Sequence, residues 1–296
     1  MLQTGKHTVT ALTRGSSTSS LPSGVQVAQV DYEDESSLVS ALLGQEILII
    51  CLAATAAPDT HDKIVVAAAK AGVPRIMPNT WGAALEYPKL EKESILGATY
   101  LANVRKIEEL GLAWTSLCSS FWYEFSLAAQ PDGYGFDMKN RKVTFYDDGE
   151  AKINTTTWKQ CARAVAAWLS LKALPKVASD ISPTVSSWTN KSIYISSFLV
   201  SQKDMLASVK RVQGGGVEWD ISHEGARERH QRGMGMVQKG DMSGFVVALY
   251  ASAFIPGRFG DFETPRGGKL DNEVLGLPEE KLDEATSRAL GMVGGV

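Results

Sequence analysis

The run Glu46-Ile-Leu-Ile-Ile-Cys-Leu-Ala-Ala54 decides how this sequence folds. It is apolar almost without a break, which is typical of a β-strand buried on both faces of a parallel sheet. Residues 59–71 follow with a helical pattern, with Asp59 or Thr60 as N-cap and Gly72 as terminator. The two segments predict one strand-and-helix step of an α/β domain.

The segments on either side repeat this alternation. We expect further strands at residues 7–14, 25–31, 75–78 and 113–119, and further helices at 34–43 and 91–110. Strands that alternate with helices predict a Rossmann-type, doubly wound parallel sheet of the α/β class. This domain is expected to occupy residues 1–125.

The second half of the chain has a mixed pattern. We expect a hairpin over residues 141–154 around Asp147-Asp-Gly149, a strand at 192–197, and helices at 157–171, 201–212, 224–236, 242–254 and 279–290. This pattern predicts a smaller α/β lobe over residues 126–296, with some elements crossing back to the sheet.

The beginning of the sequence lacks an expected element. In the doubly wound order 3-2-1-4-5, residues 7–14 would be strand 2 and residues 46–54 strand 4, so strand 1 and its glycine-rich turn would lie between them. No G-x-G-x-x-G or G-x-x-G-x-x-G occurs before Arg14. We therefore expect either that strands 2 and 4 pair directly, or that the natural protein has residues before Met1. We favour the second alternative.

Composition excludes several classes of function. The chain has 296 residues, a net charge of −3 and 21% charged residues, which gives no reason to expect direct nucleic-acid binding. No apolar stretch is long enough to span a bilayer, and no secretory signal is visible. The odd set Cys51, Cys118 and Cys161 favours a reducing, cytoplasmic compartment. The four histidines lack a ligand spacing, so no metal site is expected.

Six stretches occur in an order and spacing that point to one family. They are Gly5-Lys-His-Thr-Val-Thr-Ala-Leu-Thr-Arg14, Val30-Asp-Tyr32 with Ser37-Leu38, Ala68-Ala-Lys-Ala-Gly-Val-Pro-Arg-Ile-Met-Pro-Asn79, Trp81-Gly82, Glu108-Glu-Leu-Gly-Leu-Ala-Trp-Thr115 and Phe121-Trp-Tyr-Glu124. With them the chain resembles the NmrA-like and isoflavone-reductase-like proteins, an atypical branch of the short-chain dehydrogenases. The resemblance implies an NAD(P)-binding domain in residues 1–125 and a substrate lobe in residues 126–296.

The resemblance implies NADP(H) as the cofactor. Arg14, with Thr13 before it, stands where the family places a basic residue against the adenosine 2′-phosphate, and a guanidinium suits a phosphate. Asp31 and Tyr32 resemble the adenine-side contacts. The alternatives are an ordinary surface Arg14 and an Asp31 that caps the next helix.

Two further strand ends resemble the nicotinamide side of the cofactor site. Leu52, Ala53 and Ala54 end one strand, and Pro78 with Asn79 follows the next. Small residues there let the backbone approach a cofactor, although simple core packing explains them equally well. Asn79 is expected to hydrogen-bond the nicotinamide ribose.

The substrate and catalytic positions depart from the family. Trp81 and the run Phe121, Trp122, Tyr123 and Glu124 are candidates for the substrate pocket; an aromatic plug between the lobes is the alternative. Family reductases carry a Lys eleven residues before the Gly that precedes strand 6, and this position holds Tyr100. A Tyr can act as a general acid when nearby cations lower its pKa.

Two classes of function follow. The first is an NADPH-dependent reductase of a small aromatic or conjugated metabolite, with Tyr100 as the candidate acid. The second is a non-catalytic regulator that senses dinucleotides and binds a protein partner, which the missing Lys favours. A truncated homologue that binds no dinucleotide is a third alternative.

Overall fold

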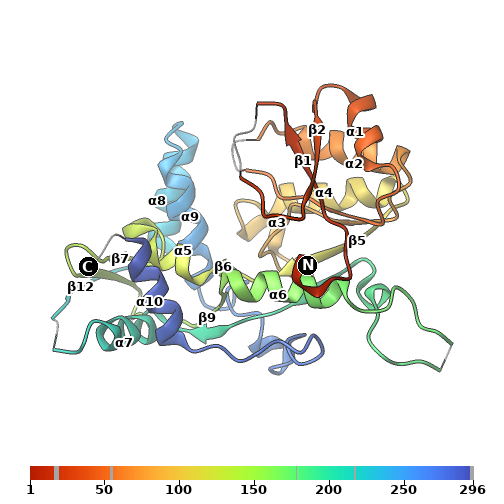
Figure 1. Cartoon of the computed structure of the whole chain (residues 1–296). Helices are drawn as coiled ribbons and strands as arrows, with labels where there is room; N and C mark the ends of the chain where they lie inside the picture. Colours follow the sequence, from red (N-terminus) through yellow and green to blue (C-terminus); the bar gives the residue numbers. More distant parts are fainter. Residues whose placement is uncertain (17–19, 54–55, 178, 217, 294–296) are drawn as a thin grey trace. The chain divides into compact units, whose positions relative to one another are not determined.

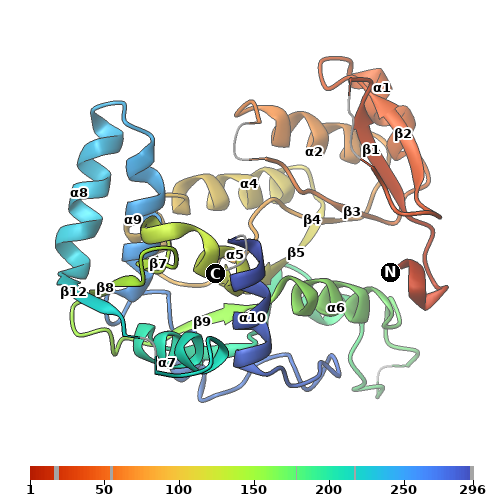
Figure 2. The same cartoon turned by 60° about the vertical axis from the view of Figure 1, so that its left-hand side comes forward.

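The computed structural model describes residues 1–16, 20–53, 56–177, 179–216 and 218–293. They form two compact units that interleave along the chain. The first unit contains Met1–Trp81, Thr99–Leu117 and Ala164–Ile193, and the second contains Gly82–Ala98, Cys118–Arg163 and Tyr194–Val296. Figures 1 and 2 show the elements of both units. The predicted division into a cofactor-binding domain at residues 1–125 and a substrate lobe at residues 126–296 differs from these two units and remains a prediction.

The first unit has the predicted α/β alternation. Its elements are η1 (Leu2–Thr4), β1 (Thr10–Arg14), β2 (Gln26–Val30), α1 (Glu35–Leu42), β3 (Ile47–Ile49), α2 (Thr60–Lys70), β4 (Arg75–Met77), α4 (Gly97–Glu109), β5 (Ala113–Cys118), α6 (Trp158–Leu169), η3 (Val185–Trp188) and β10 (Lys191–Tyr194). The beginning of α6, up to Arg163, belongs to the second unit. One sheet has the order β10-β5-β4-β3, and β3, β4 and β5 are parallel. Helices α2 and α4 lie on one face of it and α6 on the other (Figure 2). The α/β class with a parallel sheet is confirmed.

Strands β1 and β2 form a separate sheet. They pair in parallel from Thr10↔Gln26 to Arg14↔Val30, and within the described residues no ladder joins β1 to β3. The predicted alternative that strands 2 and 4, which correspond to β1 and β3, pair directly is therefore wrong. Strands β1 and β3 each keep one edge without a strand partner in the part of the chain that the structure describes.

The helix predicted at residues 91–110 is broken in two. α3 (Leu90–Glu93) ends at Ser94, and α4 begins at Gly97. A Cβ atom on Gly97 would collide with the carbonyl oxygen of Leu90, so the chain turns at a residue without a side chain. The sequence pattern marks both helical pieces as apolar on one face and does not reveal this close approach.

Within the described residues, the second unit contains two small sheets, the short helix α3 and five longer helices. Its further elements are β6 (Phe121–Trp122), α5 (Tyr123–Ala128), η2 (Gln130–Asp132), β7 (Phe136–Asp137), β8 (Lys142–Tyr146), β9 (Ile153–Thr156), β11 (Phe198–Val200), α7 (Gln202–Val212), β12 (Asp220–Glu224), α8 (Ala226–Gln238), α9 (Ser243–Phe254), η4 (Thr264–Arg266) and α10 (Leu282–Met292). The sheet orders are β11-β9-β6 and β12-β8-β7.

The hairpin predicted over residues 141–154 is wrong. The turn at Gly149 forms, since its N–H donates to the carbonyl of Tyr146. However, one edge of β8 pairs with β7 and the other with β12. Strand β9 instead joins β6 and β11. The neighbouring strand β7 and the distant strand β12 thus occupy both edges of β8, and a local pattern does not predict the pairing with β12.

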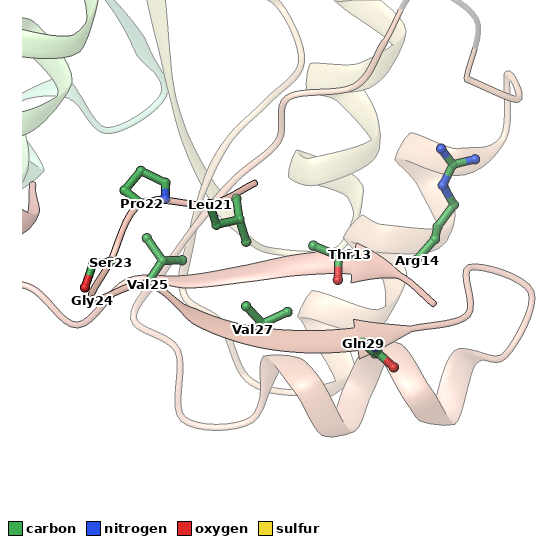
Figure 3. Close-up of a pocket in the computed structure, with 9 residues that line it drawn as sticks. All are labelled: Thr13, Arg14, Leu21, Pro22, Ser23, Gly24, Val25, Val27 and Gln29. Atoms are coloured by element: carbon green, nitrogen blue, oxygen red, sulfur yellow. The ribbon is translucent and has the colours of Figure 1, made fainter. Parts of the chain in front are cut away.

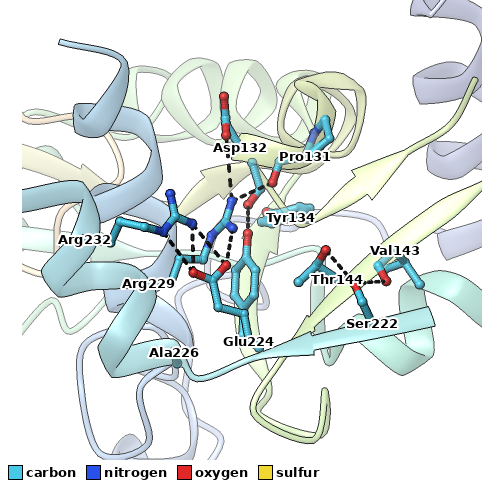
Figure 4. Close-up of polar contacts among 12 residues, drawn as sticks. Pro131, Asp132, Tyr134, Val143, Thr144, Ser222, Glu224, Ala226, Arg229 and Arg232 are labelled. Atoms are coloured by element: carbon cyan, nitrogen blue, oxygen red, sulfur yellow. Dashed lines mark hydrogen bonds and ion pairs between the residues drawn. The ribbon is translucent and has the colours of Figure 1, made fainter. Parts of the chain in front are cut away.

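An ion-pair network ties α8 to the sheet that contains β8 (Figure 4). Arg229 is 5% exposed and donates to Glu224 at 2.7 Å and to the carbonyl of Pro131 at 2.8 Å. Its guanidinium lies 4.8 Å from the centre of the Tyr146 ring. Arg232 binds the same Glu224 carboxylate from solvent. These contacts fix the beginning of α8 on the core.

Helices α8 and α9 cross at two glycines. A Cβ atom on Gly233 would lie 2.6 Å from the backbone nitrogen of Ala248, and one on Gly244 would collide with the carbonyl of Gly233. The crossing therefore needs both glycines. Within the described residues, no helix has the length and apolar character to cross a membrane.

Candidate functional site

The carboxyl ends of β3 and β4 are tied together in the first unit. The amide oxygen of Asn79 accepts the N–H of Leu52 at 3.1 Å, and Trp81 Nε1 donates to the carbonyl of Ile50 at 2.9 Å. Ligands of open α/β sheets bind at this edge. The structure thus brings together Leu52, Asn79 and Trp81, which the sequence predicted separately. Ala53 follows as an exposed residue and Pro78 is buried, whereas Ala54 lies outside the described residues.

A buried hydrogen bond joins the chain just after β4 to strand β5. Thr80 and Ser116 are fully buried, and their hydroxyl oxygens are 2.7 Å apart. The buried Thr80 hydroxyl therefore joins the end of β4 to β5.

Cys51 is a residue of this edge that the sequence reasoning did not select. Its thiol is the exposed one among the three cysteines. Partial desolvation of the sulfur by neighbouring protein atoms raises the pKa of Cys51, and the Trp81 side chain lowers it to a smaller extent. A raised pKa leaves less of the nucleophilic thiolate at neutral pH.

Arg14 ends β1 as an exposed side chain. It forms no ion pair with any described residue. It lines a cavity of about 340 Å³ together with Thr13, Leu21, Pro22, Ser23, Gly24, Val25, Val27 and Gln29 (Figure 3). Leu21, Pro22, Val25 and Val27 give the wall apolar side chains, and the Arg14 side chain extends from the end of β1 away from Leu21 and Pro22 (Figure 3). The volume lies at the lower end of the range for small-ligand sites, about 300–1,000 Å³, which suits one portion of a dinucleotide.

Asp31 and Tyr32 follow the end of β2. The Asp31 carboxylate accepts the N–H of Glu33 at 2.9 Å, and the N–H of Asp31 donates to Ser37 at 3.1 Å. Asp31 therefore shapes the turn into α1 while its side chain remains exposed. Tyr32 is half-buried.

The helix beginnings near these strands are acidic. Asp34 caps α1 by accepting the N–H of Ser36, and Asp59 and Asp62 stand at the beginning of α2. Lys63 is paired with both Glu33 at 2.6 Å and Asp59 at 2.8 Å. Helix N-termini that carry carboxylates do not favour a diphosphate. The described helix beginnings of α1 and α2 therefore do not favour the binding of a diphosphate group.

Tyr100 lies on α4 and is partly buried. Burial raises the pKa of Tyr100 to about 12, and no charged group contributes to the shift. Cations that would lower this pKa are therefore missing among the described residues. The phenol is protonated at neutral pH and can act as a hydrogen-bond donor.

The four residues of the run 121–124 lie in different environments of the second unit. Phe121 stacks on Tyr250, with ring centroids 4.3 Å apart, and Tyr123 is fully buried with its hydroxyl bonded to Thr286. Glu124 is 3% exposed and accepts from Arg288 at 3.0 Å. Trp122 alone among them is exposed, at 37%. Three of the four residues thus support the fold.

The described residues contain no group of three or more His, Cys, Asp or Glu side chains placed to hold a metal ion. Fold and site together define an α/β protein with a parallel sheet and a candidate ligand edge at the ends of β3 and β4.

Comparison with known proteins agrees with this class. Residues 1–126 match the NAD(P)H-binding family model. The oxidoreductase aprR of Aspergillus flavus is 27% identical over 96% of this chain and 91% of its own length. The crystal structure of an isoflavone reductase aligns with a TM-score of 0.70 at 21% identity, covering 97% of this chain and 92% of that one. An NADPH-dependent quinone oxidoreductase of Escherichia coli, solved with NADPH, aligns with a TM-score of 0.61 at 21% identity over 89% and 83%.

Residues 1–126 therefore contain an NAD(P)H-binding domain, and the fold is similar to that of an isoflavone reductase. The comparisons support the resemblance to the NmrA-like and isoflavone-reductase-like proteins that the sequence motifs indicate.

Proposed function

We propose that this protein is an NADPH-dependent reductase of small aromatic or conjugated carbonyl compounds. The observation that carries the proposal is Arg14, an exposed guanidinium without an ion-pair partner, at the wall of the cavity beside β1. A cation at this place favours a dinucleotide with a 2′-phosphate over one with a free ribose. The relatives named as oxidoreductases, and the quinone oxidoreductase solved with NADPH, support the same choice.

Residues of the first unit would hold the cofactor. Arg14 and Thr13 would bind the adenosine 2′-phosphate, with Asp31 and Tyr32 on the adenine side. Leu52, Ala53 and Asn79 would face the nicotinamide ribose, in line with the bond that already joins Leu52 to Asn79. When bound, the reduced nicotinamide supplies a hydride. The acceptor takes this hydride on carbon and one proton from a donor or water, leaving NADP⁺ and a two-electron-reduced product.

Tyr100 is our candidate for the hydrogen-bond donor to the acceptor. A protonated phenol polarises a carbonyl oxygen by donating a hydrogen bond, and water can then supply the proton. This role agrees with the raised pKa of Tyr100 and differs from that of a pre-ionised base. The cytoplasm, expected from the three unpaired cysteines, is the proposed location.

Steady-state assay of NADPH oxidation tests the proposal. The purified chain is mixed with NADPH and either 1,4-naphthoquinone or an isoflavone, and the reduced product is identified by mass spectrometry. We expect turnover with NADPH and much less with NADH. The alternative of a dinucleotide-sensing regulator predicts saturable binding of NADPH without turnover of either compound. The absence of binding would support a homologue that uses no dinucleotide.

A further inference from the structure

Two tryptophans of the second unit follow neighbouring parallel strands. β6 and β9 pair with Trp122 opposite Thr156, so their carboxyl ends lie at the same edge. Trp122 is the last residue of β6, and Trp158 comes two residues after β9 as the first residue of α6. The topology therefore places both indoles at one end of a parallel strand pair, although 36 positions separate them along the chain (158 − 122).

A third ring completes a cluster. The centroid of Phe125 lies 6.4 Å from that of Trp122 and 6.1 Å from that of Trp158, and the two indole centroids are 6.2 Å apart. We call these three residues the aromatic triad. Trp122 is 37% exposed, Trp158 43% and Phe125 47%. They are all of the exposed tryptophans and phenylalanines in the described part of the chain, so the exposed rings gather at one place.

Buried polar contacts hold the triad in position. The Glu124 carboxylate, between Trp122 and Phe125 in sequence and their neighbour on α5, pairs with Arg288 at 3.0 Å and approaches the N–H of Trp158 at 3.4 Å. Glu280 accepts from Thr157 at 2.7 Å and from Arg163 at 2.9 Å, which fixes the beginning of α6. A rigid support of this kind lowers the entropic cost of binding.

The chemistry of the triad favours a planar aromatic ligand. Its ring planes meet at 42° to 80°, so the rings present both faces and edges, which suit offset stacking and edge-to-face contact. Exposed aliphatic side chains occur in both units, for example Leu174 and Ile181 in the first and Ile221 and Val274 in the second. The exposed tryptophan and phenylalanine rings of the described residues, in contrast, all belong to the triad.

We propose that the aromatic triad Trp122, Phe125 and Trp158 is the surface that binds the aromatic part of the substrate. This inference rests on the proposed function for its meaning as a substrate site. It assigns Phe125 and Trp158 to binding, and of the sequence-predicted run 121–124 it retains only Trp122.

Equilibrium dialysis with flavone, a planar aromatic enone, tests this inference without turnover. We expect saturable binding to the full chain. Trp122→Leu and Trp158→Leu should each weaken it roughly 3- to 10-fold, the usual range for one aromatic contact. Trp158→Phe should retain most of the affinity. The control Ile181→Ala, at a 97% exposed aliphatic position of the first unit, should leave binding unchanged.

Two results would overturn the inference. One is flavone binding that is absent or equally strong in wild type and both Leu variants. The other is a dimer in sedimentation velocity that Trp158→Asp converts to monomer, because the triad would then be an interface between copies. NADPH titration of the same Leu variants keeps this test separate from the proposed function. We expect NADPH affinity to be unchanged, since the cofactor residues lie in the other unit.

Discussion

Asn79 and Leu52 are joined by a hydrogen bond of 3.1 Å from a backbone N–H to a side-chain amide oxygen. The bond connects the residues just after β4 and β3. It shows that Asn79 has a structural partner on the sheet edge at which α/β proteins bind ligands. The Asn79 amide nitrogen has no partner among the described residues and can donate to a ligand.

Asn79→Ala should therefore weaken NADPH binding. The variant removes the acceptor for the Leu52 N–H and the donor toward the ribose, each worth about 1 kcal/mol. We expect a loss of roughly 5- to 30-fold in affinity by fluorescence titration. Asn79→Asp keeps an acceptor for Leu52 and loses the donor, so its affinity should lie between those of Asn79→Ala and the wild type. Equal affinities in all three proteins would remove Asn79 from the site.

The pH dependence of turnover tests the role of Tyr100. Because burial raises the pKa of Tyr100 to about 12, the phenol stays protonated throughout the neutral and mildly alkaline range. The rate with 1,4-naphthoquinone should therefore show no loss that is due to Tyr100 ionising between about pH 6 and 10. Tyr100→Phe should lower kcat roughly tenfold or more without changing the shape of the profile. A limb near pH 8 that disappears in Tyr100→Phe would contradict the protonated-donor role.

The crossing of α8 and α9 gives a matched pair of stability predictions. Gly233→Ala places a methyl group against the backbone of α9 and should cost about 1–3 kcal/mol. Gly235 lies on the same helix with no atom within 4 Å of its would-be Cβ. Gly235→Ala should be neutral or stabilising by up to about 1 kcal/mol. Chemical denaturation measures both values, and equal effects of the two substitutions would contradict the tight crossing.

Because Glu224 is paired with Arg229, we expect the stability of the fold to decrease in acid. Burial, the largest single influence, raises the pKa of Glu224, but the hydrogen bonds and charges of Arg229 and Arg232 together lower it below its ordinary value of 4.5. A carboxyl with a lowered folded pKa stabilises the fold above its unfolded pKa and loses this contribution as the pH falls through the folded value. The free energy of unfolding should therefore fall below about pH 5, and less so in Glu224→Gln.

Arg229→Met checks the same network at neutral pH. It removes the buried partner of Glu224 and should cost about 3–5 kcal/mol. Arg232 is 48% exposed at its side chain, so Arg232→Met should cost at most about 1 kcal/mol. Similar losses in the two variants would show that burial does not determine the strength of this pair.

The sequence predicted the features that depend on local pattern. The apolar run at 46–54 and the helices at 59–71 and 201–212 have a periodicity and caps that need no distant partner, and β3, α2 and α7 lie within them. Ser201, the first residue of the predicted segment 201–212, caps α7 by accepting the N–H of Asp204. The hairpin at 141–154 failed because β12, far along the chain, occupies one edge of β8.

The site was predictable only in part for the same reason. Strand ends indicated Arg14, Leu52 and Asn79, because parallel strands place their carboxyl ends at one edge. Trp158 gave no signal in sequence, since its proximity to Trp122 depends on the pairing of β6 with β9. Tyr123 and Glu124 have residue types that suit a ligand, and only the structure shows their commitment to Thr286 and Arg288.

Titration of the chain with NADPH and NADH, compared between wild type and Arg14→Ala, tests the central claim most directly. A charge-assisted bond to the 2′-phosphate is worth about 1.5–3 kcal/mol, so wild type should bind NADPH roughly 10- to 100-fold more tightly than NADH. Arg14→Ala should reduce this preference to near unity, while Arg227→Ala, at an exposed arginine of the other unit, should preserve it. Equal affinities of the wild type for the two nucleotides, or a preference that survives Arg14→Ala, would contradict the account.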